Sequence, residues 1–312
     1  MKENNPKKNV IVISGITASG KTNMALQLAK IYETEIISVD SRQVYKELII
    51  GSDRPPIRYL CDVKHHMIGV ISILENFSVG IFFKRIIQLV NNLFKKYNTI
   101  ILVGGSGLYI DRLIYGIKDL PEKNGYIRDY FIKQYKKYGI YYLQNMLSNI
   151  DYKYFCYTDI NNYVRIIRAL EVYFITGKPY SYFISKNNIP GLIDKYNIIQ
   201  IAIDINKDML YNNISNRVNK MINTGLIDEA KKLYKYKNLY ALNTIGYKEI
   251  FDFIDNKISL ETAINKIKHN TYILAKKQNK WLKKYKNVIY VKSDIKILNL
   301  KNTIFNFIKN GN

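Results

Sequence analysis

Residues 15–22 read Gly-Ile-Thr-Ala-Ser-Gly-Lys-Thr, and this stretch decides the fold class. It fits the pattern G-x-x-x-x-G-K-[ST], with an apolar run at Val10–Ser14 before it and helical spacing over Lys21–Tyr32 after it. In such a loop the backbone N–H groups wrap a phosphate at a helix N-terminus. Lys21 adds a positive charge, and the Thr22 hydroxyl suits a Mg²⁺ ligand. The sequence therefore predicts a phosphate-binding loop built from Gly15, Ile16, Thr17, Ala18, Ser19, Gly20, Lys21 and Thr22.

Strands and helices alternate around this loop through residues 1–119. We expect strands at Ile36–Val39 and Thr99–Val103, with a long amphipathic helix at Phe77–Tyr97 between them. This β-α-β order is typical of a parallel sheet that binds ligands at the carboxyl ends of its strands. The predicted fold class is therefore α/β, with a parallel sheet core like that of P-loop NTPases.

The character of the chain changes at residue 120. Residues 120–196 show helical periodicity, are rich in Tyr, Lys and Asn, and contain no convincing strand, so we predict a helical insertion domain there. Asn197–Asp204 is again a strand pattern, and residues 197–312 are expected to complete the core. This last part is mostly helical, with helices predicted at 207–223, 226–236, 247–256 and 259–285 and a last strand at Val288–Val291.

Asp40 ends the second predicted strand, beside the phosphate loop. A P-loop ATPase usually supplies an acid at the end of another strand to organise Mg²⁺ and water. Here the strand that ends at Val103 runs instead into Gly104–Gly107, which contain no acid. A carboxylate at position 40 suits binding of Mg²⁺ or proton transfer from a nucleophile. The alternative is a helix N-cap.

The formal net charge is +23, from 48 basic and 25 acidic residues. Residues 201–312 carry 21 of the basic and 9 of the acidic residues, a net 21 − 9 = +12. Codon usage that favours Lys and binding to a polyanion are two alternative explanations of this excess, and the acid-free stretch at 266–286 suits a phosphate backbone. Its lysines are Lys266, Lys268, Lys276, Lys277, Lys280, Lys283, Lys284 and Lys286.

Composition excludes several classes of protein. Cys61 and Cys156 cannot form a disulfide framework, and no four-ligand Cys/His zinc cluster can be assembled. The apolar run at Val10–Ile13 is too short for a signal peptide or a membrane span. We therefore expect a soluble cytoplasmic protein with no membrane partner. For His65 and His66 we expect a structural or hydrogen-bonding role, with no metal.

Seven ordered segments together resemble the tRNA dimethylallyltransferases, also called tRNA isopentenyltransferases. They are GITASGKT (15–22), ISVDSRQVYK (37–46), KHHMIG (64–69), ILVGGSGLY (101–109), RIIRALEVYFITGKP (165–179), LNTIGYKEIFDFIDNKISLETAI (242–264) and AKKQNKWLK (275–283). The resemblance implies transfer of the prenyl group of dimethylallyl diphosphate to the N6 amine of the adenosine 3′ of the anticodon in tRNA. It implies Mg²⁺ as cofactor, tRNA and dimethylallyl diphosphate as partners, and, we expect, a monomer.

The resemblance also implies roles for individual residues. Asp40 would accept the proton of the amine, while Lys21, Thr22 and Mg²⁺ would stabilise the departing pyrophosphate, and Arg217 would face that group. The target nucleotide would contact Asp40 to Gln43, and also Ser106, where the family usually has Thr. The implied tRNA-contacting residues are Asp40, Ser41, Arg42, Gln43, Ser106, Arg128, Arg165, Arg168, Asn243, Thr244, Ile245, Gly246, Tyr247, Lys248, Lys276, Lys277, Gln278, Lys280, Trp281 and Lys283.

Several positions depart from the family pattern. Gly69 stands where the family commonly has Asp, Ser52 where it has Thr, and Tyr272 and Ile273 where arginines are expected. Three alternatives to the tRNA enzyme stay open at this point. They are a P-loop nucleotide or small-molecule kinase, an RNA-binding protein without catalysis, and a prenyltransferase that acts on free adenine nucleotides.

Overall fold

The computed structural model describes residues 8–186, 188–285 and 287–309. The chain divides into two compact units. The core unit contains the described residues up to Tyr115 and from Gly191 onward, and the helical unit contains residues 116–190. In the described ranges, no helix combines the length and apolar character that a membrane crossing requires.

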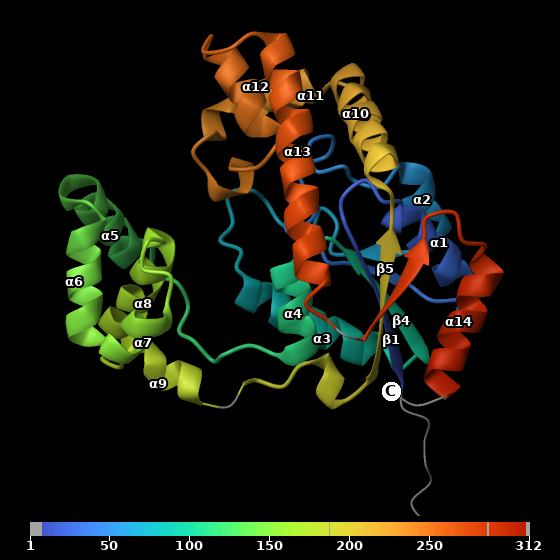
Figure 1. Ribbon diagram of the computed structural model, residues 1–312, viewed down its shortest axis with the longest axis horizontal. Helices are drawn as coiled ribbons and strands as arrows, with labels where there is room; N and C mark the ends of the chain where they lie inside the picture. Colours follow the sequence, from blue (N-terminus) through green and yellow to red (C-terminus); the bar gives the residue numbers. More distant parts are fainter. Residues whose placement is uncertain (1–7, 187, 286, 310–312) are drawn as a thin grey trace, which may run out of the picture. The chain divides into compact units, whose positions relative to one another are not determined.

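The core unit is built on a parallel sheet of six strands (Figure 1). The strands are β1 (Asn9–Ser14), β2 (Ile36–Ser38), β3 (His65–His66), β4 (Thr99–Gly104), β5 (Asn197–Asp204) and β6 (Val288–Lys292). Their order is β3-β2-β4-β1-β5-β6, and every neighbouring pair is parallel. The central strands β1 and β4 are almost wholly buried, as in sheets covered on both faces. The predicted parallel α/β core is confirmed.

Helices and short 3-10 turns connect and cover these strands. In the core unit they are α1 (Lys21–Ile31), α2 (Ile57–Asp62), α3 (Val79–Leu93), α4 (Gly107–Tyr115), η1 (Leu192–Asp194), α10 (Lys207–Asn223), α11 (Leu226–Leu233), η2 (Tyr234–Tyr236), η3 (Tyr240–Leu242), α12 (Tyr247–Ile254), α13 (Leu260–Leu282) and α14 (Ile297–Lys309). The helix expected at Phe77–Tyr97 is shorter, because the Ser78 hydroxyl accepts from the Ile81 N–H and begins the helix there.

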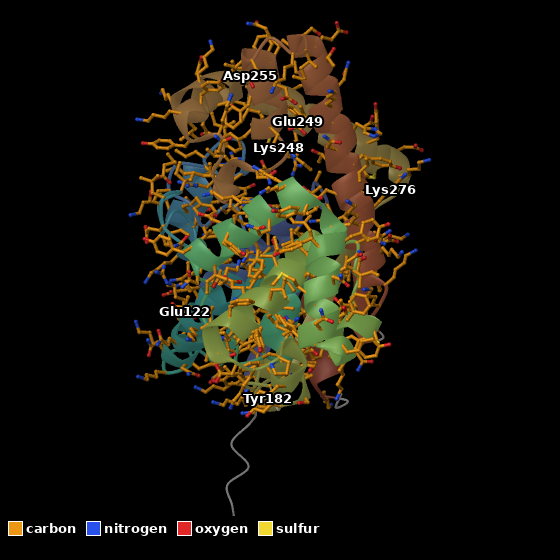
Figure 2. All side chains as sticks on the ribbon, turned by 90° about the vertical axis from the view of Figure 1, so that its left-hand side faces the viewer. Glu122, Tyr182, Lys248, Glu249, Asp255 and Lys276 are labelled. Carbon is orange, nitrogen blue, oxygen red and sulfur yellow. The ribbon has the colours of Figure 1, made fainter. Side chains whose placement is uncertain are left out.

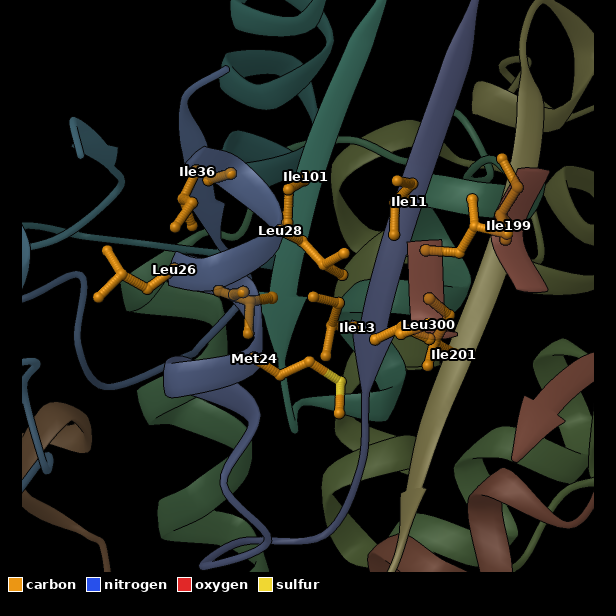
Figure 3. Packing of buried hydrophobic residues seen from close by; sticks show 14 of the residues in the cluster. Ile11, Ile13, Met24, Leu26, Leu28, Ile36, Ile101, Ile199, Ile201 and Leu300 are labelled. Atoms are coloured by element: carbon orange, nitrogen blue, oxygen red, sulfur yellow. The ribbon is translucent and has the colours of Figure 1, made fainter. Parts of the chain in front are cut away.

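The main hydrophobic core lies between the sheet and the helices α1 and α14. Figure 3 shows Ile13 of β1 and Ile201 of β5 on the side of the sheet where Leu28 of α1 and Leu300 of α14 pack. All four side chains are fully buried, and each contributes roughly 1.5–3 kcal/mol through burial. This packing fixes α1, and so it fixes the loop that joins β1 to α1.

The helical unit contains α5 (Gly125–Tyr138), α6 (Ile140–Ile150), α7 (Tyr152–Tyr157), α8 (Tyr163–Thr176) and α9 (Tyr180–Ser185). Phe131, Leu143 and Leu170 are fully buried in a core of its own. Its limits differ from the predicted 120 and 196, because a backbone bridge joins Ile117 to Ile189 and Leu192–Asp194 packs against α4 in the core unit.

Candidate active site

The loop between β1 and α1 lines a cavity of about 290 Å³. Thr17 to Thr22 line this cavity, whereas Gly15 and Ile16 of the predicted loop are not among its lining residues. Lys21 turns back over the loop, and its Nζ donates to the Ile16 carbonyl at 2.6 Å. The Thr17 N–H donates to Oε1 of Gln278 at 2.8 Å, which ties the loop to α13. A buried β-strand before the loop and a helix after it give the arrangement that binds phosphate groups.

Arg217 of α10 lies at the same cavity, as the resemblance implied. Its Nη1 donates to the Thr17 hydroxyl at 2.6 Å and to Oδ2 of Asp53 at 3.2 Å. Sequence reasoning missed Asp53, since a position 164 residues from Arg217 carries no local signal of the ion pair. Two cations, Lys21 and Arg217, therefore face one cavity that suits a polyanion.

Burial, and to a smaller extent the nearby Arg217, lower the pKa of Lys21 to about 8, although Asp40 and Asp53 oppose the shift. The ammonium is thus less stable here than in water. A bound diphosphate would reverse this effect, because opposite charge favours the protonated amine.

Asp40 follows β2 and shapes its own loop. Its Oδ1 accepts from the N–H groups of Arg42 at 2.7 Å and Gln43 at 3.2 Å, an Asx-type turn. The N-cap alternative is wrong, because the described residues 41–56 contain no helix. Gly104 permits this position, since a Cβ there would lie 2.0 Å from the Val39 carbonyl oxygen. The close approach of the ends of β2 and β4 places Asp40 beside the phosphate loop.

A second, larger cavity of about 710 Å³ adjoins the first. Asp40, Gly105 and Gln278 line both cavities, so these residues lie where the two cavities meet. Among the residues that the resemblance implied for tRNA, those that line the second cavity are Asp40, Ser41, Arg42, Ser106, Asn243, Thr244, Ile245, Lys248, Lys277, Gln278 and Trp281. The residues that sequence reasoning missed there are Gly105, Gly107, Leu108, Tyr109, Glu249, Asn270 and Leu274.

Arg42 and Gln43 hold neighbouring loops together. The Arg42 guanidinium donates to the carbonyls of Tyr240 and Ala241, each at 3.0 Å, and stacks over the Tyr240 ring at 5.1 Å. Gln43 lines the loop cavity, and its Nε2 donates to the Asp53 carbonyl at 3.0 Å. Both side chains thus hold loops of the site together by hydrogen bonds to backbone carbonyls, in addition to any contact that they make with a ligand.

Helix α13 presents its lysines in two directions. Lys277 and Trp281 line the second cavity, and the Trp281 Nε1 donates to Asp111 at 2.9 Å. Lys276, Lys280 and Lys283 are exposed at helical spacing on the adjoining side, outside the cavity wall. Figure 2 labels Lys276 on α13, with Lys248 and Glu249 on α12. Lys286 lies outside the described residues.

Tyr247 corrects one prediction. Its side chain is fully buried and its hydroxyl donates to Glu229, so it does not reach a nucleic acid. Helical periodicity cannot reveal the burial of Tyr247, because Tyr247 is the first residue of α12. The residues Asn243 to Ile245, which shortly precede it and were predicted with it, do line the second cavity. Gly246 lies next to them, at a smaller cavity lined also by Asp40 and Arg217.

The three arginines predicted to contact tRNA from the helical unit differ in availability. Arg165 is exposed. Arg128 and Arg168 instead bind the fully buried Glu171 at 3.3 and 2.8 Å, and Arg168 also donates to the Pro121 carbonyl. A buried carboxylate needs such partners, so these two guanidinium groups have a structural role within the unit.

The residues at the loop fit a magnesium ion that binds mainly through the phosphate groups of a substrate. Thr22 lines the cavity, and the buried Ser19 hydroxyl there has no partner in the described structure. No cluster of three His, Cys, Asp or Glu side chains suited to a metal occurs among the described residues. Mg²⁺ typically keeps several waters and binds through substrate phosphates, which matches one or two hydroxyl ligands.

Both histidines make hydrogen-bonding contacts. His66 pairs with Glu35, and Nδ1 of His65 contacts the Val63 carbonyl at 2.7 Å. Burial lowers the pKa of His65, which favours its neutral form. His65 also lines the loop cavity, a position that its sequence context did not reveal.

The positions that depart from the family pattern have ordinary surroundings. Ser52 donates to the Leu48 carbonyl at 2.6 Å, and Gly69 has a left-handed φ of 60° beside the Arg54 guanidinium. Tyr272 packs under the Lys276 ammonium at 4.6 Å. Ile273 lines the second cavity, where it supplies apolar surface in place of charge.

Comparison with known proteins gives a consistent result. Residues 43–285 match the family described as IPP transferase. The chain is 43% identical over 283 residues to tRNA dimethylallyltransferase 2 of Azobacteroides pseudotrichonymphae, which covers 90% of this chain and 91% of that protein. It is 41% identical over 300 residues to the tRNA dimethylallyltransferase of Christiangramia forsetii, with 96% and 97% covered.

Solved structures agree with these sequences. The tRNA isopentenylpyrophosphate transferase of Bacillus halodurans superposes with a TM-score of 0.70 at 33% identity, over 97% of this chain and 98% of that one. A eukaryotic dimethylallyltransferase described as acting on tRNA gives 0.77 at 25% identity, over 92% of this chain and 74% of that one. The similarity therefore extends through nearly the whole chain in both sequence and fold.

Proposed function

The chain belongs to the IPP transferase family, and on that premise we propose that it transfers a dimethylallyl group from dimethylallyl diphosphate to the N6 amine of the adenosine 3′ of the anticodon in tRNA. The observation that carries the proposal is the place of Asp40, which lines both the loop cavity and the larger cavity beside it. A carboxylate at that junction can take a proton from an acceptor while a diphosphate leaves on the other side.

The proposed reaction forms a bond between N6 of the adenine and C1 of the dimethylallyl group, and breaks the bond between C1 and the diphosphate oxygen. Asp40 takes the N6 proton, and pyrophosphate leaves. Lys21 and Arg217 face the cavity in which negative charge grows, and such pre-oriented charges stabilise the transition state most strongly. When Mg²⁺ is bound at Thr22, it neutralises part of the charge on the diphosphate. The target base must leave its stack to reach the second cavity.

One experiment tests the proposal against its alternatives. The protein is incubated with Mg²⁺, labelled dimethylallyl diphosphate and unmodified tRNA whose anticodon is followed by two adenosines. We expect label in the tRNA at the first of these adenosines. Label in free AMP or ADP alone would support a prenyltransferase for nucleotides. ATP-dependent phosphoryl transfer to a small acceptor, with no label in RNA, would support a kinase, and tRNA binding without either reaction would support a binding protein.

We further propose that the enzyme acts as a monomer in the cytoplasm.

The pKa of Lys21 predicts how diphosphate binding depends on pH. The protonated amine binds the anion, and its pKa in the free protein is about 8. Affinity for inorganic pyrophosphate should therefore stay level below pH 7.5 and fall about tenfold per unit above pH 8. Calorimetry between pH 6.5 and 9.5 measures this. The Lys21→Met variant is the control, because it keeps the titration of the ligand itself, and a parallel pH profile in that variant would refute the assignment.

The exposed lysines of α13 predict a salt effect on tRNA binding. We expect the triple variant Lys276→Gln/Lys280→Gln/Lys283→Gln to bind tRNA more weakly and to reduce the slope of log affinity against log salt by about 2–3. The charge-matched control, Lys95→Gln/Lys96→Gln/Lys309→Gln, changes exposed lysines just before β4 and at the end of α14. Equal slopes in the two triple variants would show that the α13 lysines do not contact phosphate.

A further inference from the structure

Glu229 of α11 binds backbone N–H groups far from its own helix. Its Oε2 accepts from the N–H of Ile49 at 3.2 Å and of Ile50 at 2.9 Å, and its Oε1 accepts from the N–H of Ile50 at 3.1 Å and of Gly51 at 3.0 Å. Hydrogen bonds to a charged acceptor are about twice as strong as neutral ones. Among the described residues that line the two cavities Glu229 does not occur, so the proposed chemistry leaves it without a role.

Tyr247 completes this binding arrangement. Its hydroxyl donates to Oε1 of Glu229, and its ring is fully buried. Burial and the nearby carboxylate raise the pKa of Tyr247, so the hydroxyl stays protonated and remains a donor. Gly51 lies directly against the ring, since a Cβ at that position would come within 2.5 Å of two ring carbons. The backbone at 49–51 therefore rests on one carboxylate and one aromatic ring.

Residues 49–54 form a tight turn that leads from the Glu229 carboxylate and the Tyr247 ring to the loop cavity. The N–H of Asp53 donates to the Ile50 carbonyl at 3.0 Å, and the N–H of Arg54 donates to the Ile49 carbonyl at 3.2 Å. The Asp53 carboxylate then binds Arg217, whose Nη1 also reaches Thr17 in the phosphate loop. An uninterrupted series of contacts thus runs from Glu229 to the guanidinium that faces the cavity.

We propose that Glu229 and Tyr247 are positioning residues for the diphosphate, which act by holding the 49–54 turn so that Asp53 orients Arg217. The inference rests on the proposed function, because it assigns the cavity at Arg217 to a diphosphate. Without the Glu229 carboxylate, three backbone N–H groups lose their acceptor and the turn loses its fixed position. Arg217 then keeps its charge but loses the direction that Asp53 gives it.

Two variants change the contacts of Glu229 and Tyr247 with the turn, at positions that do not line either cavity. Glu229→Gln replaces one carboxylate oxygen with an amide NH₂, which cannot accept from the backbone N–H groups. Tyr247→Phe removes only the hydroxyl and keeps the ring that packs on Gly51. Asp228→Asn is the matched control, because it makes the same kind of change at the preceding residue, whose side chain is 74% exposed.

Calorimetry with inorganic pyrophosphate and Mg²⁺ is the primary measurement. We expect Glu229→Gln to weaken pyrophosphate binding about tenfold, or ~1.4 kcal/mol, Tyr247→Phe about threefold, and Asp228→Asn not at all. At saturating donor and tRNA, kcat should fall as well, because Arg217 also faces the cavity in which charge grows on the leaving pyrophosphate. The double variant Glu229→Gln/Arg217→Gln should bind no more weakly than Arg217→Gln alone, because the first change acts through Arg217.

The outcomes separate the inference from the function on which it rests. If the unchanged protein fails to bind pyrophosphate, the proposed function is wrong. If it binds, but folded Glu229→Gln and Tyr247→Phe bind equally well, the positioning role is wrong. An additive loss in the double variant also contradicts it, since a merely structural role would act independently of Arg217. Should Glu229→Gln fail to fold, Tyr247→Phe with and without Arg217→Gln gives the same comparison.

Discussion

Replacement of Asp40 by asparagine is expected to lower the rate of dimethylallyl transfer by about 10²–10⁴-fold, the usual contribution of a general base. Asparagine keeps an oxygen that can accept from the N–H groups of Arg42 and Gln43, so the turn after β2 should keep its form. It cannot take a proton from N6 of the acceptor. The change therefore removes the proposed proton acceptor and keeps the local geometry. Asp40→Ala would also remove the oxygen that accepts from the two N–H groups, so it would not keep that geometry.

Single-turnover rates with labelled dimethylallyl diphosphate and tRNA measure this loss, and a filter-binding assay measures tRNA affinity. We expect tRNA affinity within about twofold of the unchanged protein. Asp62→Asn is the control, because that carboxylate is partly exposed and pairs with Lys30, away from both cavities. A near-normal rate for Asp40→Asn would rule out Asp40 as the base. A large loss of tRNA affinity would instead assign Asp40 to binding.

The Lys21→Met variant should lose about 10²–10³-fold in kcat, because Lys21 faces the cavity in which the leaving pyrophosphate gains charge. Methionine keeps much of the length and apolar volume of the lysine chain, so the loss reports the missing charge. We expect kcat to fall more than the affinity for dimethylallyl diphosphate, since the leaving group carries more charge than the bound substrate.

Lys30→Met is the matched control for this variant. Lys30 lies near the end of the same helix, where it pairs with Asp62 at the surface, and its removal should leave kcat unchanged. If Lys21→Met raised KM for the donor with kcat intact, Lys21 would contribute to ground-state binding alone. Equal kcat values in the two variants would remove Lys21 from the mechanism.

Much of the core could be predicted from the sequence, because its signals are local. The loop at 15–22, the strand patterns at Val10–Ser14 and Asn197–Asp204, and the helix at 207–223 each depend on residues close together in the chain, and all occur as predicted. The two-residue strand His65–His66 and the helix Gly107–Tyr115 were missed. The former is too short to show alternation, and the glycines before the latter resemble a loop.

The candidate site was predictable only where the phosphate-loop pattern, a strand end or the family resemblance marked it. Asp40 and Lys21 fall in this class. Tyr247 does not, because burial of its side chain depends on Glu229 and Gly51 from other parts of the chain. Asp53 was also missed, for the same reason.

The sequence by itself determined that a phosphate loop joins a buried strand to a helix, and that a carboxylate ends the next strand. Local periodicity and the polarity of a parallel sheet are sufficient for both statements. Only the tertiary structure decided that Gln278 and Arg217 meet Thr17, and that Glu229 holds the backbone at Ile50. These contacts join residues that are 179 to 261 positions apart, and they depend on how the helices pack, which no local pattern records. The chemistry of this protein thus begins in one short motif, and packing at long sequence range positions the groups around it.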